Sequence, residues 1–253
     1  MLALEAIYRG RTLNLAHRGA REAAPENTLP AFVRAVEMGA DGVELDVHLT
    51  FDDVPICLHS FTLEETTDGT GYPSEFTLEQ IKEFDAGMKF DAAFAGTPIP
   101  SLAEVFEAIP NAFVNVELKS LTFNDTGLER AVLDVIRAQG AEARVIISSF
   151  NPFCLRRMRK LAPDLPLGQL TDSDLPIVLR KGWLLFGIKR QAIHPHHTMV
   201  DARYMQAARK KNWRVNTWTV NEPEDMRRLL ALGVDSIMTD RPDLLKTVMD
   251  AGV

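Results

Sequence analysis

The feature that most constrains this chain is the alternation of short apolar β-runs with helical stretches along its length. A helical stretch after each buried strand is typical of βα units in a parallel sheet. The predicted strands are residues 13–17, 42–47, 113–119, 144–149, 165–170, 192–194, 213–218 and 235–238. The predicted helices are residues 28–38, 101–109, 128–139, 152–161, 173–183, 200–211, 222–232 and 242–251. Eight such units in about 250 residues predict an α/β fold of the closed (β/α)8, or TIM-barrel, type.

One segment, residues 50–100, departs from this alternation. It lies between the second strand and the next helix and is too long for a simple βα loop. It contains an extended run at 54–59, a turn at 66–71 and a short helical pattern at 78–84. Insertions on the carboxyl-end rim of a barrel often carry substrate contacts, so we expect a lid or small subdomain there. No repeat or linker indicates a second domain, and we expect residues 1–253 to form one domain that contains this insertion.

Composition excludes several classes of protein. The net charge of −7 argues against a nucleic-acid partner. No apolar run approaches the length of a bilayer span, since residues 183–188 are far too short, and the N-terminus lacks the order of a signal peptide. Only Cys57 and Cys154 are present, which fits a reducing compartment, so we expect a cytoplasmic protein with no integral membrane segment. The sequence leaves open whether the chain forms a homo-oligomer.

Two strand-like pentads carry acids where a barrel strand should be buried. They read VELDV at 43–47 and NVELK at 115–119. Because side chains alternate along a strand, Glu44 and Asp46 share one face of the first pentad, and Glu117 shares a face with the lysine at 119 in the second. Buried acids are costly unless they are paired or hold a metal. Three carboxylates on two such strands predict a site for one hard divalent cation, Ca²⁺, Mg²⁺ or Mn²⁺.

Further polar residues end the predicted strands, where barrel enzymes place their catalytic groups, while the strand interiors are expected to be apolar. Histidine at positions 17 and 59 suits proton transfer to and from a phosphate ester near neutral pH. The planar guanidinium of Arg18 and the ammonium group of Lys119 are suited to hold the oxygens of a phosphate group. The sequence therefore predicts phosphoryl chemistry, without saying which histidine is the acid and which is the base.

The same residues carry a resemblance to a known family. The motifs are LAHRGA at 15–20, APENT at 24–28, GADGVELDV at 39–47, LH at 58–59, VELK at 116–119, ISSF at 147–150, WTVN at 218–221 and GVDSIMTDRP at 233–242. In this order they resemble the glycerophosphodiester phosphodiesterases, and the resemblance spans essentially the whole chain. It implies a TIM barrel with an insertion after the second strand, and hydrolysis of a small-molecule glycerophosphodiester to glycerol 3-phosphate and an alcohol with one divalent metal ion. The roles that it implies are acid/base catalysis for His17 and His59, metal binding for Glu44, Asp46 and Glu117, and phosphate contact for Arg18 and Lys119.

Two alternatives stay open, one because of a departure from the family pattern and one because of apolar residues in the insertion. Family members usually have Asp directly after the second histidine, whereas this chain has Ser60. If that change removes activity, the chain is a non-catalytic barrel that binds a phosphodiester. If the aromatic residues of the insertion contact a lipid chain, it is a lysophospholipase D. Trp218 is expected to form a wall of the substrate pocket, and the histidines at 194, 196 and 197 are interpreted as a loop rather than a metal site.

Overall fold

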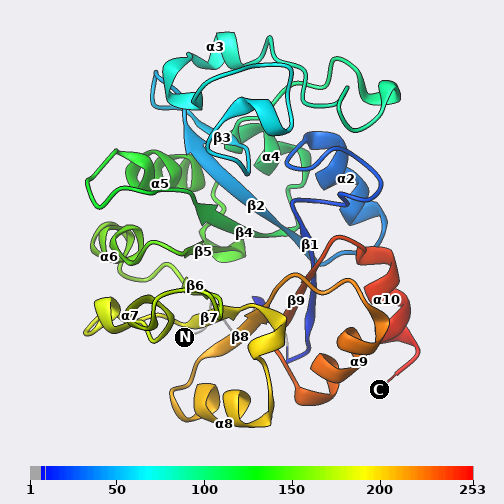
Figure 1. Cartoon of the computed structure of the whole chain (residues 1–253), viewed down its shortest axis with the longest axis vertical. Helices are drawn as coiled ribbons and strands as arrows, with labels where there is room; N and C mark the ends of the chain where they lie inside the picture. Colours follow the sequence, from blue (N-terminus) through cyan, green and yellow to red (C-terminus); the bar gives the residue numbers. More distant parts are fainter. Residues whose placement is uncertain (1–6, 9, 253) are drawn as a thin grey trace.

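The computed structural model describes residues 7–8 and 10–252, so most of the N-terminal segment assessed for a signal lies outside the described residues. Eight parallel strands form a ring, which the pairing of β1 with β2 closes. Figure 1 shows the strands at the centre with helices around them. The strands of the ring are β1 (Leu13–His17), β2 (Gly42–Leu49), β4 (Phe113–Leu118), β5 (Val145–Ser149), β6 (Leu167–Thr171), β7 (Ala192–Pro195), β8 (Arg214–Thr217) and β9 (Ser236–Thr239). The predicted (β/α)8 barrel is confirmed.

The helices lie outside the ring because one face of each strand is apolar. On β2, for example, Val43, Leu45 and Val47 are fully buried against the surrounding helices, while the residues between them point into the barrel. The helices are α2 (Leu29–Glu37), α3 (Leu78–Ile81), α4 (Leu102–Ala108), α5 (Leu128–Ala138), α6 (Pro152–Leu161), α7 (Ile177–Arg180), α8 (Ala202–Lys210), α9 (Pro223–Leu232) and α10 (Pro242–Asp250).

Two elements differ from their predicted extent. The helix expected at 173–183 is reduced to the four residues of α7, followed by a 3-10 turn at Trp183–Leu185. Pro176 sits at the N-cap of α7, and Gly182 takes a left-handed conformation (φ 65°) that ends the helical path. Strand β2 runs to Leu49, two residues beyond its predicted end, because His48 and Leu49 pair with the neighbouring strand β3 (Pro55–Cys57).

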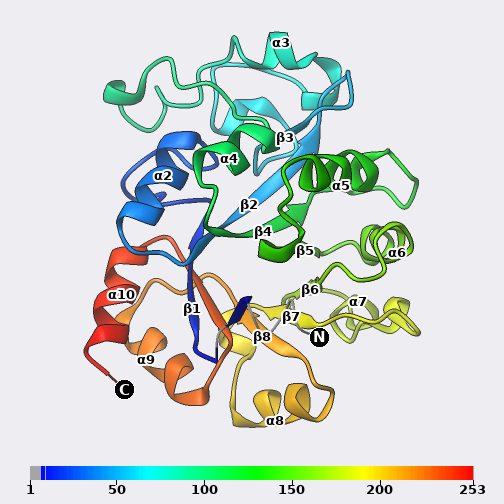
Figure 2. The ribbon, with the colours of Figure 1, turned by 180° about the vertical axis from the view of Figure 1, so that it is seen from behind.

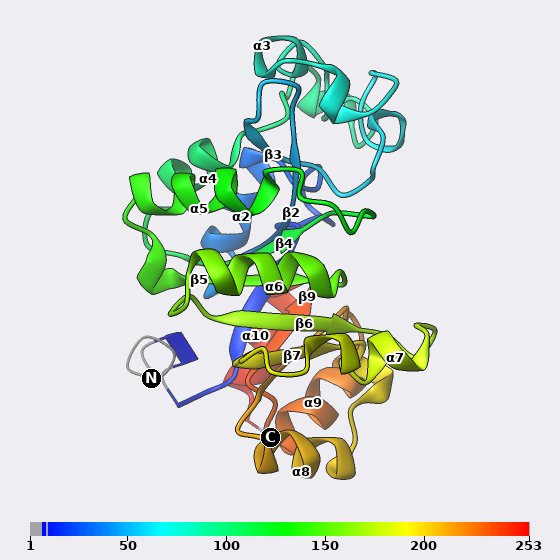
Figure 3. The same cartoon turned by 90° about the vertical axis from the view of Figure 1, so that its left-hand side faces the viewer.

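The insertion, residues 50–100, is attached to the barrel through β3. This strand runs antiparallel to β2, outside the ring, with Val47 opposite Cys57. The insertion has its own apolar cluster, formed by Ile56, Leu58, Leu63, Ile81, Ala86 and Ile99. Figure 3 shows it at one end of the molecule, beyond β3. Its helix α3 is shorter than the helical pattern at 78–84 predicted.

The barrel interior is more polar than the sequence suggested. The apolar strand interiors expected above are wrong for the inward face, where Asn115, His194 and Asn216 are fully buried. Asn216 donates a hydrogen bond from Nδ2 to the hydroxyl of Tyr8 (2.8 Å) and also contacts His194 Nε2 (3.0 Å). Tyr8, 1% exposed, is thereby linked to polar groups of two neighbouring strands of the ring, which Figure 2 shows from behind.

Among residues 7–8 and 10–252, no helix combines the length and the apolar character that a membrane span needs. Each is too short or too polar for a bilayer span.

Candidate active site

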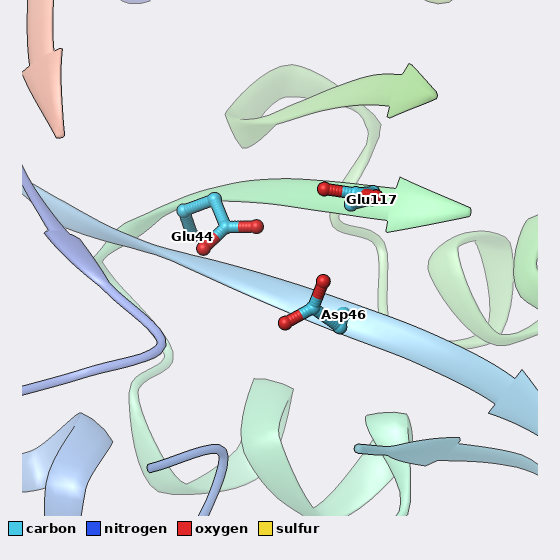
Figure 4. Close-up of side chains that lie close together, drawn as sticks. All are labelled: Glu44, Asp46 and Glu117. Carbon is cyan, nitrogen blue, oxygen red and sulfur yellow. The ribbon is translucent and has the colours of Figure 1, made fainter. Parts of the chain in front are cut away.

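The register of the strands brings the three predicted acids together. His17 on β1 is paired with Glu44 on β2, and Asp46 is paired with Glu117 on β4. Paired residues of parallel strands point to the same face, here the barrel interior. One carboxylate oxygen from each of Glu44, Asp46 and Glu117 lies within 4.8 Å of the others. Figure 4 shows the three carboxylates converging from the two strands.

Burial and mutual repulsion shape the charge of this cluster. Loss of water raises the pKa of Glu44 well above its usual value, and the charges of Asp46 and Glu117 raise it further. Burial also raises the pKa of Glu117 to about 7, although Lys119 opposes that shift. Three acids in this arrangement therefore carry their full negative charge only when enough positive charge lies beside them.

Two cations from the chain supply part of that charge. Lys119 Nζ lies 3.3 Å from Asp46 and 3.2 Å from Glu117, and Arg18 Nε lies 3.4 Å from Asp46. Burial alone would raise the pKa of Asp46, but Lys119 and Arg18 lower it to about 2. Asp46 also accepts a hydrogen bond from Asn27 Nδ2 at 3.0 Å. Asp46 is thus the permanently ionised member of the cluster.

The cluster fits a hard divalent cation. All three groups offer oxygen donors, which Ca²⁺, Mg²⁺ and Mn²⁺ prefer. The three carboxylates, when ionised, carry one more charge than Arg18 and Lys119 neutralise, and a divalent ion would supply the missing positive charge. The donor set contains no sulfur or imidazole, so it favours these ions over zinc.

The loop after β1 holds Arg18 in an unusual conformation. Arg18 has a left-handed backbone (φ 57°), and its backbone N–H donates to the carbonyl oxygen of Glu44 at 2.9 Å. Gly19 follows with φ 86°, and a side chain there would collide with Ala31 at 2.7 Å. The Arg18 guanidinium donates to Glu26 at 3.0 Å, so its position is fixed from two sides.

His17 is held by a carboxylate, Asp240, to which the sequence alone assigned no role. His17 Nδ1 lies 2.7 Å from Asp240 Oδ1, at the end of β9. The other oxygen of Asp240 accepts a hydrogen bond from Asn221 Nδ2 at 2.7 Å. The hydrogen bond to His17 lowers the pKa of Asp240 against the opposing effect of burial. Asp240 therefore favours a proton on Nδ1 and leaves Nε2 for proton exchange.

The second predicted histidine, His59, follows β3 and comes from the insertion. Burial lowers its pKa to about 4; Asp46 opposes this shift, while Arg18 and Lys119 add to it. The neighbouring Ser60 hydroxyl donates to the carboxylate of Glu65. The carboxylate of Glu65 thus lies beside Ser60, the position where family members usually have Asp.

Trp218 lies across the barrel mouth from the acidic cluster, since β1 and β9 separate β8 from β2 in the ring. Its indole packs edge-on against Phe150 (5.6 Å) and His196 (5.2 Å). Its Nε1 donates to the carbonyl oxygen of His194 at 2.8 Å. These contacts fix the ring as part of an aromatic rim. His194 lies within β7, as the predicted strand at 192–194 places it, whereas His196 and His197 follow the strand; the interpretation of the three histidines as one loop is therefore wrong for His194 alone.

Known proteins share both the sequence and the fold. The model of the glycerophosphoryl diester phosphodiesterase family matches residues 17–244. A glycerophosphodiester phosphodiesterase of Caldanaerobacter subterraneus subsp. tengcongensis is 41% identical over 244 residues, covering 96% of this chain and 99% of the relative. An Oleispira antarctica phosphodiesterase, solved in complex with the product sn-glycerol-3-phosphate, has a TM-score of 0.86 at 28% identity, over 96% and 99% of the chains. A glycerophosphodiester phosphodiesterase of Agrobacterium tumefaciens has a TM-score of 0.80 at 29% identity, over 93% and 99%. The chain belongs to the glycerophosphoryl diester phosphodiesterase family.

Proposed function

We propose that this protein hydrolyses glycerophosphodiesters to glycerol 3-phosphate and an alcohol, with the aid of one divalent metal ion. The observation that carries the proposal is the set of three buried carboxylates within 4.8 Å of one another, at the end of the barrel where His17 is held by Asp240. The family relation and the product bound to the Oleispira antarctica phosphodiesterase support the substrate class.

Glu44, Asp46 and Glu117 would hold the metal. When bound, the ion polarises a phosphate oxygen and offsets the charge that grows in the transition state. Arg18 and Lys119, which border the carboxylates, would hold the remaining phosphate oxygens. Trp218 would form a wall of the substrate pocket as part of the aromatic rim.

The two histidines differ in their surroundings, and we infer their roles from that difference. Burial keeps the ring of His59 neutral at neutral pH, which suits it to accept a proton at the attacking oxygen. The carboxylate of Asp240 holds the ring of His17 at Nδ1, which leaves Nε2 free to give a proton to the departing alcohol. The first proton transfer is thus assigned to His59 of the insertion and the second to His17 of β1.

The test is a coupled assay for glycerol 3-phosphate on a panel of diesters, with EDTA and then Ca²⁺, Mg²⁺ or Mn²⁺ added back. We expect turnover of glycerophosphocholine or glycerophosphoethanolamine that EDTA abolishes and one of these ions restores. Glu44→Ala should lower metal-dependent turnover at least about 100-fold, since loss of groups that merely support a ligand costs 10–100-fold. Glu37→Ala, at an exposed position on α2, is the matched control and should keep wild-type turnover. Wild-type rates for Glu44→Ala would exclude this metal site.

A lysophospholipase D activity is the second candidate, because the insertion exposes apolar side chains. Met88 is 53% exposed and Phe90 is 41% exposed, and Phe90 packs edge-on against Phe94 at 5.5 Å. These residues could contact an acyl chain. Turnover of lysophosphatidylcholine that exceeds turnover of glycerophosphocholine would make this the better account. Binding of metal and diester without hydrolysis of any substrate would instead favour a non-catalytic barrel.

A further inference from the structure

Residues 183–186, here called the aromatic turn, expose large apolar side chains that the proposed reaction does not use. Phe186 is 91% exposed and Trp183 is 61% exposed, with Leu184 at 37%. The turn follows α7, which Figure 3 shows beyond the arrowhead of β6. Exposed apolar side chains that lie next to one another, unlike single ones, mark contact with a partner or a membrane.

The aromatic turn is held in place rather than loosely attached. Leu185 is buried in the main apolar core, 2% exposed, and anchors the middle of the turn. The guanidinium of Arg156 on α6 donates to the carbonyl oxygen of Leu184 at 3.0 Å. Gly182 and Gly187 flank the turn with left-handed backbones, at φ 65° and 75°. The fold therefore presents these side chains to solvent in a fixed arrangement.

Cations surround the aromatic turn although the protein as a whole is acidic. Residues 153–190 contain eight Arg or Lys and only three acids, within a chain of net charge −7. The turn is bracketed in the sequence by Arg180 and Lys181 on one side and by Lys189 and Arg190 on the other. Arg156, Lys160, Lys181 and Lys189 are exposed. This surface is complementary to a negatively charged partner.

A cationic cavity of about 360 Å³ adjoins the aromatic turn, between α7 and α8. Arg180, Lys181 and Lys211 line it together with Trp213 and Tyr204, and none of its lining residues is acidic. Lys211 Nζ lies 4.4 Å from the centre of the Trp213 ring. The hydroxyl of Tyr204 is buried without a hydrogen-bond partner among the described residues. Such a cavity suits an anionic head group.

We propose that this face docks the protein on an anionic phospholipid bilayer. The aromatic turn enters the interface, the surrounding lysines and arginines contact acidic lipids, and the cavity takes one phosphate head group. An apolar tip with Trp and Phe, flanked by cations, is the pattern that interfacial binding requires. A symmetric contact with a second copy of this chain would place these cations opposite each other, so the charge disfavours that occupant.

The experiment measures co-sedimentation with phosphatidylcholine vesicles, with and without roughly one third of phosphatidylglycerol, at about 0.1 M salt. We expect at least about 10-fold tighter binding to the anionic vesicles, reduced by high salt. The double variant Trp183→Ser/Phe186→Ser should bind the anionic vesicles at least about 10-fold more weakly. Phe51→Ser removes an equally large side chain, 71% exposed in the turn between β2 and β3, and should bind like the wild type. Both variants change solvent-exposed residues and should keep the wild-type unfolding temperature and diester turnover.

Three results would overturn the proposal. The first is equal sedimentation of the wild type with neutral and anionic vesicles. The second is unchanged binding by the double variant while Lys181→Glu/Lys189→Glu loses it, which would mean contact by charge without insertion. The third is a dimer, seen by light scattering, that the double variant converts to a monomer without any vesicle binding. Lys211→Glu tests the cavity separately: weaker binding to anionic vesicles supports a head-group site, and unchanged binding removes that part of the proposal.

Discussion

At the scale of single residues, the site depends on partners that hold the predicted groups in position. Asn27 takes a left-handed backbone (φ 56°) and donates to Asp46, while Asp240 holds His17. Neither contact has a local sequence signal. His17 and Asp240 are 223 positions apart in the chain, and Asn27 and Asp46 are 19 positions apart. The positions of both groups follow from closure of the ring, where β9 returns to pair with β1.

Asp240→Asn tests whether the carboxylate positions His17. The amide keeps the shape of the side chain but removes the charge that favours a proton on His17 Nδ1. We expect kcat to fall about 10- to 100-fold, the loss typical when a partner that orients a functional histidine is removed, with KM changed much less. The measurement is the pH profile of kcat in the glycerol 3-phosphate assay.

The control for that variant is Asp243→Asn, the same change at an exposed position in the first turn of α10. It should keep the wild-type kcat. A wild-type kcat and pH profile for Asp240→Asn would show that the contact with His17 has no part in turnover.

At the scale of elements, the sequence predicted the positions of the strands and the faces of their side chains, because both follow from periodicity and from glycines at element ends. The acids of VELDV and NVELK lie on the inward face as period two requires, and all eight strands of the ring lie close to their predicted positions. The weakest prediction, the helix at 173–183, failed where proline and a left-handed glycine interrupt the pattern. The polar barrel interior could not be predicted, because burial of Asn115 and Asn216 depends on strands distant in the sequence.

Gly42 gives an element-scale prediction, because β2 and β4 approach closely where both begin. A Cβ at Gly42 would lie 2.0 Å from the carbonyl oxygen of Phe113, a backbone atom that cannot turn away. Gly42→Ala should lower the free energy of unfolding by about 3 kcal/mol or more, the upper range for overpacking. Urea unfolding measures this change.

Gly140→Ala is the control with which the loss of unfolding free energy for Gly42→Ala is compared. Gly140 has a left-handed backbone (φ 56°) but no atom within 4 Å of the added Cβ, so only backbone strain of roughly 1–2 kcal/mol is expected. A smaller loss for Gly42→Ala than for Gly140→Ala would show that the two strands can separate at little cost.

At the scale of the whole molecule, a buried histidine links stability to pH. Burial lowers the pKa of His194 to about 3, whereas an unfolded histidine has a value near 6.5. The unfolded chain therefore binds a proton between these values that the folded protein excludes, and stability falls as the pH drops below about 6.5. Between about pH 6.5 and pH 5, this residue alone should account for a loss of about 1.6 kcal/mol.

His194→Gln should remove that part of the acid sensitivity. The comparison of unfolding free energies at the two pH values, in wild type and variant, cancels the contributions of the carboxylates. His196→Gln, at a partly exposed position near the barrel mouth, is the control and should decline like the wild type. An equal decline in wild type and His194→Gln would show that protonation of His194 does not drive the loss.

The short strand β3 has a consequence for any exchange of parts between relatives. It pairs with the same strand that supplies Glu44 and Asp46, and the chain reaches His59 two residues after β3 ends. Grafting a foreign loop in place of residues 50–100 would therefore replace β3 and His59 together, and would pair a foreign segment with the strand that carries the two acids. A working chimera has to transfer β2, β3 and the insertion as one block, with its joints before Gly42 and at the start of α4.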